Sequence, residues 1–424
     1  MKVRRPPCTD PPRSSRLFAA AGPALRGHHA RFGRVPVQAA ETLISSLEAA
    51  GLTGRGGAGF PTGRKMASVI GRKPVVIGNG AEGEPLSLKD ATLMALAPHL
   101  ILDGLQLVAE ALGADKVYLY LPNDVALNAQ YALDERAAAG LDRRRVIVVE
   151  SPDTFIAGEE SAVVRRIEGG PAIPRDRTVP TSRSGVRGRP TLVNNVETLA
   201  HIALIARYGH HWFRSVGDPG EPGTMLITLS GAVRRRSVVE LPTGTPLAQV
   251  LRSGGVFALR DVGAVLLGGY HGSWMATAAL AEARLSRAGL APFGASPGAG
   301  IVHVLPTDEC GLVHTAGIVA YLAEQGARQC GPCRNGLPRL AQLFDELAYG
   351  PVDDGLLDEL KRMLGIVDGR GACRHPDGTV RLARTALDTF ASDIAHHRAG
   401  RCHAALTAAQ EADRHDGPSN AGAT

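Results

Sequence analysis

The sequence has few aromatic residues and no long apolar run. Aromatic side chains make up 4% of the 424 residues. Its longest apolar stretches, such as Ile202–Ala206 and Val262–Leu267, are far shorter than the about 20 residues that a membrane-spanning helix needs. The first forty residues also lack the apolar run of a secretory signal. We therefore expect a protein of the cytoplasm with no direct membrane insertion.

Cysteine is too scarce for a disulfide scaffold, since the chain has only six. Cys330 and Cys333 form a C-x-x-C pair, and Cys373 follows further along the chain. In a reducing compartment, clustered thiols more often bind metal or carry out redox chemistry than form static bridges. Taken alone, the C-x-x-C pair is equally typical of a redox dithiol or a zinc site.

Positive charge is in excess, with a net charge of +6, and part of it lies in residues 1–40 among Pro and Gly. We expect these residues to form a basic, disordered tail. No aromatic or base-reading pattern accompanies the charge, so nucleic acid is not an expected partner. A second, polar tail is expected over residues 409–424.

The length predicts two to four domains. Strands expected at Val75–Ile77, Lys116–Leu121 and Val146–Glu150 alternate with helical patterns, which favours an α/β domain with a largely parallel sheet over residues 41–220. Residues 221–305 follow a β-β-α-β order that is typical of a small β-grasp module. Residues 306–408 read as a helical bundle.

A glycine loop, residues 54–63, begins with Gly54, Gly56 and Gly57 and matches the G-x-G-x-x-G pattern. A Rossmann site requires a strand before this pattern, but here a helix precedes it. The glycines still allow backbone N–H groups to converge on an anion, and Lys65 adds a cation beside them. A flexible turn is the alternative interpretation.

Three further polar groups each have a local structural explanation. Asn79 and Glu84 lie in a loop at a strand end, where ligands gather in α/β sheets. Helix dipoles favour carboxylates where a helix opens, as at 158–160, and Asn194 and Asn195 suit a helix cap. Their joint occurrence in this order is far more specific than any one of them.

Together the segments GLTGRGGAGFPTGRK (51–65), NGAEGEPLSLKD (79–90), FIAGEESA (155–162), GRPTLVNNVETL (188–199) and CGPCRNG (330–336) carry a resemblance. The chain resembles the NADH-binding flavoprotein subunit of respiratory complex I and its relatives in soluble hydrogenases and formate dehydrogenases. The resemblance implies an FMN-binding α/β domain, a β-grasp (SLBB-type) module, and a helical bundle with a [4Fe–4S] cluster.

The resemblance also implies roles for individual residues. It places the FMN phosphate region at Gly54, Gly56, Gly57 and Lys65. It completes the flavin site with Asn79, Gly158, Glu159, Asn194, Asn195 and Thr198. It puts Glu84 and Glu160 close to the nicotinamide nucleotide, stacks the NADH adenine on Phe60, and assigns the cluster to Cys330, Cys333 and Cys373.

The sequence departs from the family at three places. Ala327 stands where the family has a further cluster cysteine, so the fourth ligand is Cys310, Cys402, His375 or a non-protein group, or the cluster is absent. Family aromatics near the nucleotide are replaced by Met66, Ser68 and Pro180, each loss costing about 0.5–1.5 kcal/mol. Ala81 replaces an acidic residue that hydrogen-bonds the flavin, and Phe155 replaces Tyr.

The expected function is that of an NADH dehydrogenase-like oxidoreductase. Electrons would pass from NAD(P)H through FMN and a [4Fe–4S] cluster to a ferredoxin-like or complex I-type electron-transfer subunit, at the periphery of a membrane complex or free in the cytoplasm. One alternative is an electron-transfer or assembly subunit that keeps the fold without oxidising NADH. A third hypothesis is a structural paralogue without cofactors.

Overall fold

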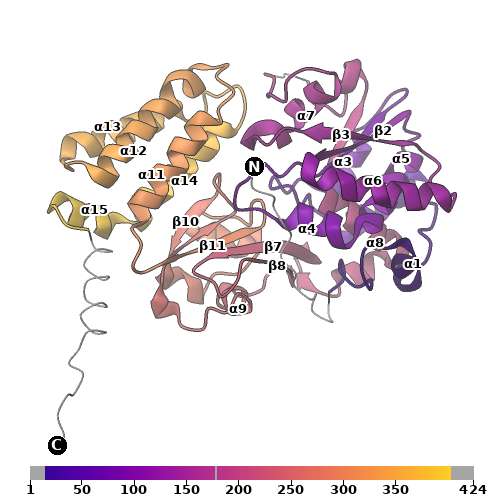
Figure 1. The fold of residues 1–424 in the computed structure, drawn as a ribbon, viewed down its shortest axis with the longest axis horizontal. Coiled ribbons are helices and arrows are strands. Elements are labelled where there is room, and N and C mark those ends of the chain that lie inside the picture. Colours follow the sequence, from indigo (N-terminus) through magenta and orange to yellow (C-terminus); the bar gives the residue numbers. More distant parts are fainter. Residues whose placement is uncertain (1–14, 177–178, 403–424) are drawn as a thin grey trace, which may run out of the picture.

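The computed structural model describes residues 15–176 and 179–402, and its main elements are two sheets and a group of C-terminal helices (Figure 1). The first sheet has the order β3-β2-β1-β4 and is parallel throughout. Its strands are β1 (Val75–Asn79), β2 (Lys116–Pro122), β3 (Val146–Ser151) and β4 (Thr191–Asn195). The prediction of an α/β unit with a parallel sheet is confirmed.

β4 was not among the predicted strands, which is a correction. The sequence pattern suggests a helix from Asn194, but residues 191–195 pair with β1, and the helix α8 starts only at Val196. A five-residue strand leaves too short a pattern to identify locally, and its pairing with β1 is a long-range contact. As a result Gly78 lies opposite Asn194, and Asn79 opposite Asn195.

Helices pack around the first sheet, some on its strands and others on neighbouring helices. They are α2 (Ala40–Ala50), α3 (Thr62–Ala67), α4 (Lys89–Leu96), α5 (Pro98–Ala111), α6 (Asn123–Ala138), α7 (Glu160–Ile167) and α8 (Val196–Arg214). α5 and α8 pack on each other and are buried along most of their lengths. Burial of this apolar surface, at about 25 cal/mol per Å², is the main favourable term that holds the unit together.

Residues 15–39 are not a disordered tail, which corrects the prediction for this part of the chain. Leu17 is fully buried, and a short helix, α1 (Leu25–Phe32), packs against α5 and α6. Glu240, far away in the sequence, accepts hydrogen bonds from the backbone N–H groups of Arg16 and Leu17 at 2.9 Å each. Residues 1–14 and the tail expected at 409–424 lie outside the described residues.

The second sheet has the order β10-β9-β11-β7-β8. Its elements are β7 (Thr224–Gly231), β8 (Ser237–Pro242), α9 (Leu247–Ser253), β9 (Val262–Leu267), β10 (Ser273–Ala276), α10 (Arg287–Leu290) and β11 (Ile301–Pro306). β11 runs parallel to β7 and antiparallel to β9. A two-stranded ribbon, β5 (Gly217–Asp218) with β6 (Glu221–Pro222), precedes it.

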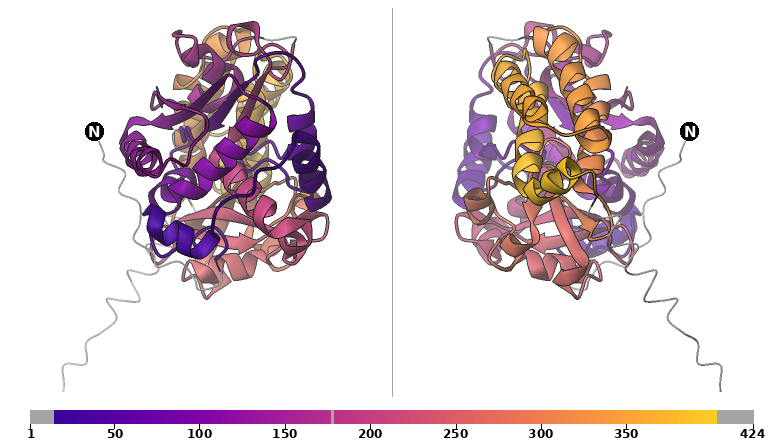
Figure 2. Two further views of the ribbon diagram at one scale, coloured as in Figure 1. Left: turned by 90° about the vertical axis from the view of Figure 1, so that its right-hand side faces the viewer. Right: turned by 90° about the vertical axis from the view of Figure 1, so that its left-hand side faces the viewer.

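From residue 311 the described chain is helical and packs beside the second sheet (Figures 1 and 2). The helices are α11 (Gly311–Glu324), α12 (Leu337–Tyr349), α13 (Asp354–Val367), α14 (His375–Thr389) and α15 (Ala391–Arg398). α14 and α15 are divided at Phe390, whose ring packs on Trp274 of β10.

Among the described residues, no single helix is long and apolar enough to cross a bilayer. Only α4 and α5 taken together reach that length and composition, and they bend by 95° where they meet.

Candidate functional site

The glycine loop joins α2 to α3 and folds back on itself. The N–H of Gly54 donates to the carbonyl of Phe60 at 2.9 Å. Gly57 and Gly59 adopt φ values of 108° and 62°, in the left-handed region that favours glycine. A Cβ on Gly59 would lie 1.9 Å from Nη2 of Arg287, which itself donates to the Gly57 carbonyl at 2.9 Å. The loop therefore needs small residues, and Arg287 is a neighbour that the sequence did not indicate.

The loop faces the carboxyl ends of β1 and β4. A Cβ on Gly56 would approach Cβ of Asn195 to 3.2 Å, so backbone and strand end are close. Next to it, Asn194 is buried, with 6% exposure, and its Nδ2 has no hydrogen-bond partner among the described residues. A buried amide donor without a partner costs about 1–3 kcal/mol. An acceptor on a bound ligand would remove that cost.

Asn79 and Gly158 meet above the end of β1. Nδ2 of Asn79 donates to the Gly158 carbonyl at 2.9 Å, and its Oδ1 accepts from the N–H of Ala81 at 3.1 Å. This arrangement fixes two polar loops against each other. A Cβ on Gly158 would lie 3.4 Å from the carbonyl oxygen of Ala81, which leaves little spare room between them.

Asn195 connects the site to a buried ionic network that the sequence analysis missed. Its Oδ1 caps α8 by accepting from the N–H of Glu197 at 3.0 Å, and its Nδ2 donates to Asp90 at 2.7 Å. Lys89 lies 2.6 Å from Asp90 and 2.9 Å from Glu197. Burial alone would lower the pKa of Lys89, but these carboxylates raise it above its ordinary value.

Thr198 and Arg55 fix the start of the glycine loop. The N–H of Arg55 donates to Oγ1 of Thr198 at 2.9 Å, and its buried guanidinium lies 3.6 Å from Glu221. Burial lowers the pKa of Arg55, and Glu197 and Glu221 act in the opposite direction. Thr198 thus positions the loop from within the first turn of α8.

Lys65 and Glu160 form a pair beside the loop. Nζ of Lys65 donates to the Val193 carbonyl at 2.6 Å and lies 3.4 Å from Oε2 of Glu160. Glu160 also accepts a hydrogen bond from Thr181. Because both side chains remain partly exposed, the ammonium group is within reach of an anion in the loop.

The remaining predicted residues have mixed surroundings. Glu159 caps α7 by accepting from the N–H groups of Ser161 and Ala162 at 2.9 and 3.1 Å. Glu84 accepts from the N–H of Tyr270 at 2.8 Å, which ties the strand-end loop to the second sheet. Phe60 is 51% exposed at the tip of the glycine loop, so one face of its ring is open to a stacking partner.

Cys330, Cys333 and Cys373, here called the thiol triad, lie together between α11, α12 and α14. Burial, followed by the neighbouring Cys330 thiol, raises the pKa of Cys333 to about 12. Burial also raises the pKa of Cys373, and the carboxylate of Glu159 contributes in the same direction.

The structure separates the candidates for a fourth ligand. His375 is buried: its Nδ1 is 3.0 Å from Nε2 of His271, and its Nε2 is 2.8 Å from the Leu322 carbonyl. Cys310 and Cys402 lie with His397, in a group apart from the thiol triad. Among residues 15–176 and 179–402, neither these cysteines nor His375 completes the triad.

Phe155 connects the two halves of the site. It lies in a one-turn 3₁₀ helix, Phe155–Gly158, and its N–H donates to Oε1 of Gln325 at the end of α11 at 2.9 Å. Its ring contacts four aromatic rings from the second sheet and the C-terminal helices: Tyr270, His271, Tyr321 and His375. The flavin-side loops are thereby packed against the helices that bear the thiols.

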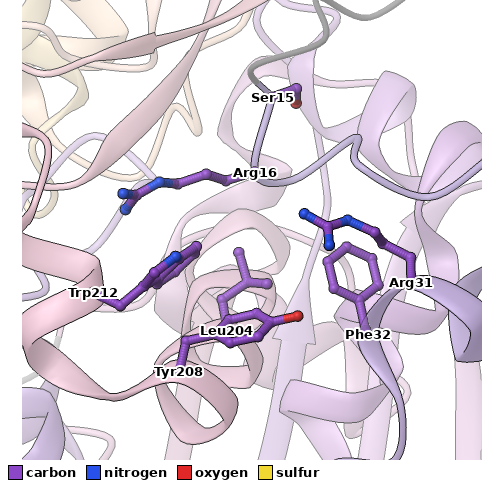
Figure 3. Close-up of a pocket in the computed structure, with 7 residues that line it drawn as sticks. All are labelled: Ser15, Arg16, Arg31, Phe32, Leu204, Tyr208 and Trp212. Atoms are coloured by element: carbon purple, nitrogen blue, oxygen red, sulfur yellow. The ribbon is translucent and has the colours of Figure 1, made fainter.

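A surface hollow of about 330 Å³ lies elsewhere, between α1, α8 and residues 15–16 (Figure 3). The Arg16 guanidinium stacks on the Trp212 ring at 4.0 Å, which fills part of it. It contains none of the predicted site residues, and we assign it no role.

Known proteins resemble this chain along most of its length. Residues 47–204 match the family model of the Nuo51 FMN-binding domain, and residues 314–397 match that of the NADH-ubiquinone oxidoreductase-F iron-sulfur binding region. The chain is 30% identical over 380 residues to the NADH-quinone oxidoreductase F 2 subunit of Rhizobium meliloti (strain 1021), covering 85% of this chain and 90% of that protein. It is 29% identical over 375 residues to the NADH-quinone oxidoreductase F subunit of Escherichia coli (strain K12), covering 84% of each.

A solved structure supports the same assignment. A chain of the NAD⁺-reducing [NiFe]-hydrogenase in the air-oxidized state matches with a TM-score of 0.78 and 28% identity, over 90% of this chain and 68% of that chain. Family models, relatives and fold agree, and the chain therefore belongs to the family of NADH-quinone oxidoreductase F subunits.

Proposed function

We propose that this chain is an NADH-oxidising electron-transfer subunit that uses FMN and a [4Fe–4S] cluster. The observation that carries the proposal is the proximity of two half-sites. The glycine loop and the unpartnered amide of Asn194 meet at the ends of β1 and β4, and Phe155 packs this edge against the C-terminal helices that carry the thiol triad.

The flavin half-site fits an anionic, hydrogen-bonding ligand. Backbone N–H groups at Gly54, Gly56 and Gly57, with Lys65 beside them, would hold the phosphate. Nδ2 of Asn194 would donate to the flavin, while Asn195 and Thr198 fix the edge from the side of α8. FMN, when bound, accepts a hydride and releases electrons singly, so the protein supplies orientation and charge.

For the nicotinamide nucleotide, we propose Phe60 as the stacking surface and Glu84 and Glu160 as nearby carboxylates. Phe60 is exposed, and Glu160 is held by Lys65 and Thr181. Glu84 is held by the N–H of Tyr270. Both carboxylates are thus oriented by the protein before a nucleotide binds.

We propose that Cys330, Cys333 and Cys373 bind three irons of the cluster and that a non-protein group completes the fourth position. Three converging thiols match the sulfur donors that iron–sulfur clusters prefer. A non-protein ligand is favoured because His375 already contacts the Leu322 carbonyl. Cys310 and Cys402 are grouped with His397.

The proposed domains are residues 41–220 for the flavin and nucleotide, 221–305 as an SLBB-type β-grasp module, and 306–408 as an iron–sulfur helical bundle. Support comes from three groups of buried residues, which centre on the first sheet, on the second sheet and on α11–α15, the first and the last also including residues of the second sheet. The proposed partners are complex I-type or ferredoxin-like electron-transfer subunits, since relatives of this chain are subunits of such complexes.

The test is anaerobic purification followed by flavin and iron analysis and titration with NADH. We expect about one FMN per chain, iron in the ratio of one cluster, and loss of flavin absorbance on adding NADH. A Gly57→Ala variant should lose flavin. Its control is Gly365→Ala, because a Cβ at this position on the outside of α13 meets open space. A colourless protein that NADH does not alter would contradict the proposal.

A second function is favoured by one observation. Met66, at a position near which the family has a nucleotide-binding aromatic, is 1% exposed and belongs to the core, so it offers no stacking surface. A subunit that keeps the cofactors without oxidising NADH would have flavin that a reduced ferredoxin reduces and NADH does not. The same titration distinguishes the two functions.

A further inference from the structure

A second group of metal-binding side chains lies away from the thiol triad. Cys310 precedes α11, His397 lies in the last turn of α15, and Cys402 follows that helix. Their ligand atoms all lie within 4.8 Å of one another, and Sγ of Cys310 is 3.6 Å from Nε2 of His397. Figure 1 shows α15 beside the beginning of α11, so two segments that are far apart in the sequence meet here.

The imidazole of His397 is already oriented for metal binding. Its Nδ1 lies 3.1 Å from the carbonyl oxygen of Leu347, the partner that requires a proton on Nδ1. The lone pair is then on Nε2, the nitrogen that faces the two thiols. In protein metal sites, the ring nitrogen of a histidine ligand that does not bind the metal usually donates a hydrogen bond to a backbone carbonyl or a carboxylate.

Burial raises the pKa of Cys310 to about 11, and the first turn of α11 acts in the opposite direction. The N–H groups of Leu312 and Val313, in the first turn of α11, hydrogen-bond this sulfur. These are N–H groups of a helix N-terminus, where negative charge is stabilised. The thiol thus has donors in place before any cation arrives.

The separations agree with one particular coordination. With Zn–S bonds of about 2.3 Å and Zn–N bonds of about 2.0 Å, a tetrahedral site separates sulfur from nitrogen by about 3.5 Å. The observed 3.6 Å between Cys310 and His397 is close to this value. Two sulfurs and one imidazole nitrogen are a soft set of donors, which favours Zn²⁺ over Mg²⁺ or Ca²⁺.

We propose that Cys310, His397 and Cys402 bind one Zn²⁺ ion, with a water molecule in the fourth position. The ion acts as a structural clamp, because its ligands come from two segments that are far apart in the sequence. It fixes the end of α15 to the start of α11, and through Leu347 to the end of α12. The thiol triad lies beyond the other end of α11, whose 14 residues span about 21 Å.

The test uses the full chain, expressed with zinc and iron and dialysed into metal-free buffer, with both metals measured per chain. We expect about one retained zinc in the parent protein. Cys310→Ser, Cys402→Ser and His397→Gln should each lower zinc retention by about 10-fold or more. Iron should not change in the His397→Gln variant, and His314→Gln, at a partly exposed histidine of α11 that pairs with Glu309, should keep both metals.

Two readouts separate loss of the ion from loss of the fold. The extended X-ray absorption fine structure of zinc in the parent protein should show two sulfur ligands at about 2.3 Å and nitrogen or oxygen ligands at about 2.0 Å. The reciprocal variant, Cys330→Ser, should lose iron and keep zinc. The zinc measurement is independent of the proposed function, since zinc would be found whether or not the chain binds flavin.

Several results would overturn the proposal. Parent protein without retained zinc would do so, as would a zinc content that Cys310→Ser and His397→Gln leave unchanged. A zinc edge without sulfur ligands would exclude these thiols. A disulfide between Cys310 and Cys402 in anaerobically prepared, alkylated protein would replace the zinc site by a redox bridge.

Discussion

Asn194 and Asn195 are neighbours in the sequence, but their side chains have opposite surroundings. Nδ2 of Asn194 is buried without a partner among the described residues, whereas Asn195 caps α8 and donates to Asp90. One amide is therefore available for a ligand, and the other is used by the fold itself.

This difference predicts separable effects of two matched variants. Asn194→Ala should leave the melting temperature of the cofactor-free protein nearly unchanged and weaken FMN binding by about 5- to 150-fold, because a bound acceptor loses about 1–3 kcal/mol. Asn195→Ala should lower the stability of the cofactor-free protein by about 1–2 kcal/mol, since a helix cap is lost. Calorimetry of both, with and without FMN, checks this. Equal melting temperatures for the two variants would contradict it.

Ala327 is a second residue whose effect is specific. A Cβ on its neighbour Gly326 would lie 3.5 Å from Sγ of Cys333, so this turn passes close to the thiol triad. Ala327→Cys should add a fourth thiolate and slow the loss of iron in air several-fold. Gln342→Cys, an exposed position on α12, is the control for simply adding a thiol. Iron loss that is the same in both variants would mean that residue 327 does not reach the cluster.

At the scale of elements, one buried carboxylate joins α1, α5, α6 and α8. Asp103 of α5 lies 2.8 Å from both His28 and Arg136, and it also pairs with Arg207. Burial alone would raise the pKa of Asp103, but these partners together hold it well below its ordinary value. Because the pKa of Asp103 is lower in the folded protein than in the unfolded chain, the free energy of unfolding depends on pH.

The sign of that coupling follows from the depressed pKa. The contribution of Asp103 is fully present above the unfolded carboxyl pKa of about 3.9, and it is lost as the pH falls further towards the folded value. Asp103→Asn should cost about 3–5 kcal/mol at pH 7, because buried cations lose their partner, and less at pH 3. Urea unfolding at several pH values measures this difference.

Asp115→Asn is the control, since Asp115 pairs with Arg189 at 2.6 Å on the surface. Its substitution should change stability little at any pH. A difference between Asp103→Asn and the parent protein that stays constant from pH 7 to pH 3 would show that the cost comes from packing and not from charge.

Across the whole molecule, Phe155 joins the first sheet to the C-terminal helices. The centre of its ring lies 4.6 Å from the ring centre of His271 and 5.7 Å from that of His375. Its N–H donates a hydrogen bond to Gln325. Since flavin and cluster are proposed to lie on either side of this contact, its packing sets the distance between them.

Phe155→Ala should therefore affect one electron-transfer step and not the other. Reduction of the flavin by NADH should stay within about two-fold of the parent rate. Reduction of the cluster should slow at least several-fold, because the Phe155 ring no longer holds the flavin-side loops against the helices that bear the thiols. Stopped-flow absorbance follows both steps, and Tyr131→Ala, at a 70% exposed ring of α6, is the control. Equal slowing of both steps would indicate a general loss of structure.

Much of this protein could be predicted from the sequence because the decisive signals are local. The glycine loop, the C-x-x-C pair and the alternation of strands and helices are read within a few residues of chain, and the resemblance they carry pointed to the family that the comparisons show. Backbone requirements such as those of Gly57 and Gly59 are likewise fixed by residue type.

Only the tertiary structure decided the contacts between distant segments. Glu240 holds Arg16 and Leu17 across more than 220 residues, which orders a segment that looks disordered by composition. The strand β4, the burial of His375 and the grouping of Cys310 with His397 and Cys402 depend in the same way on partners far along the chain. Short-range patterns carry no information on such pairs, because side chains meet only once sheets and helices have packed.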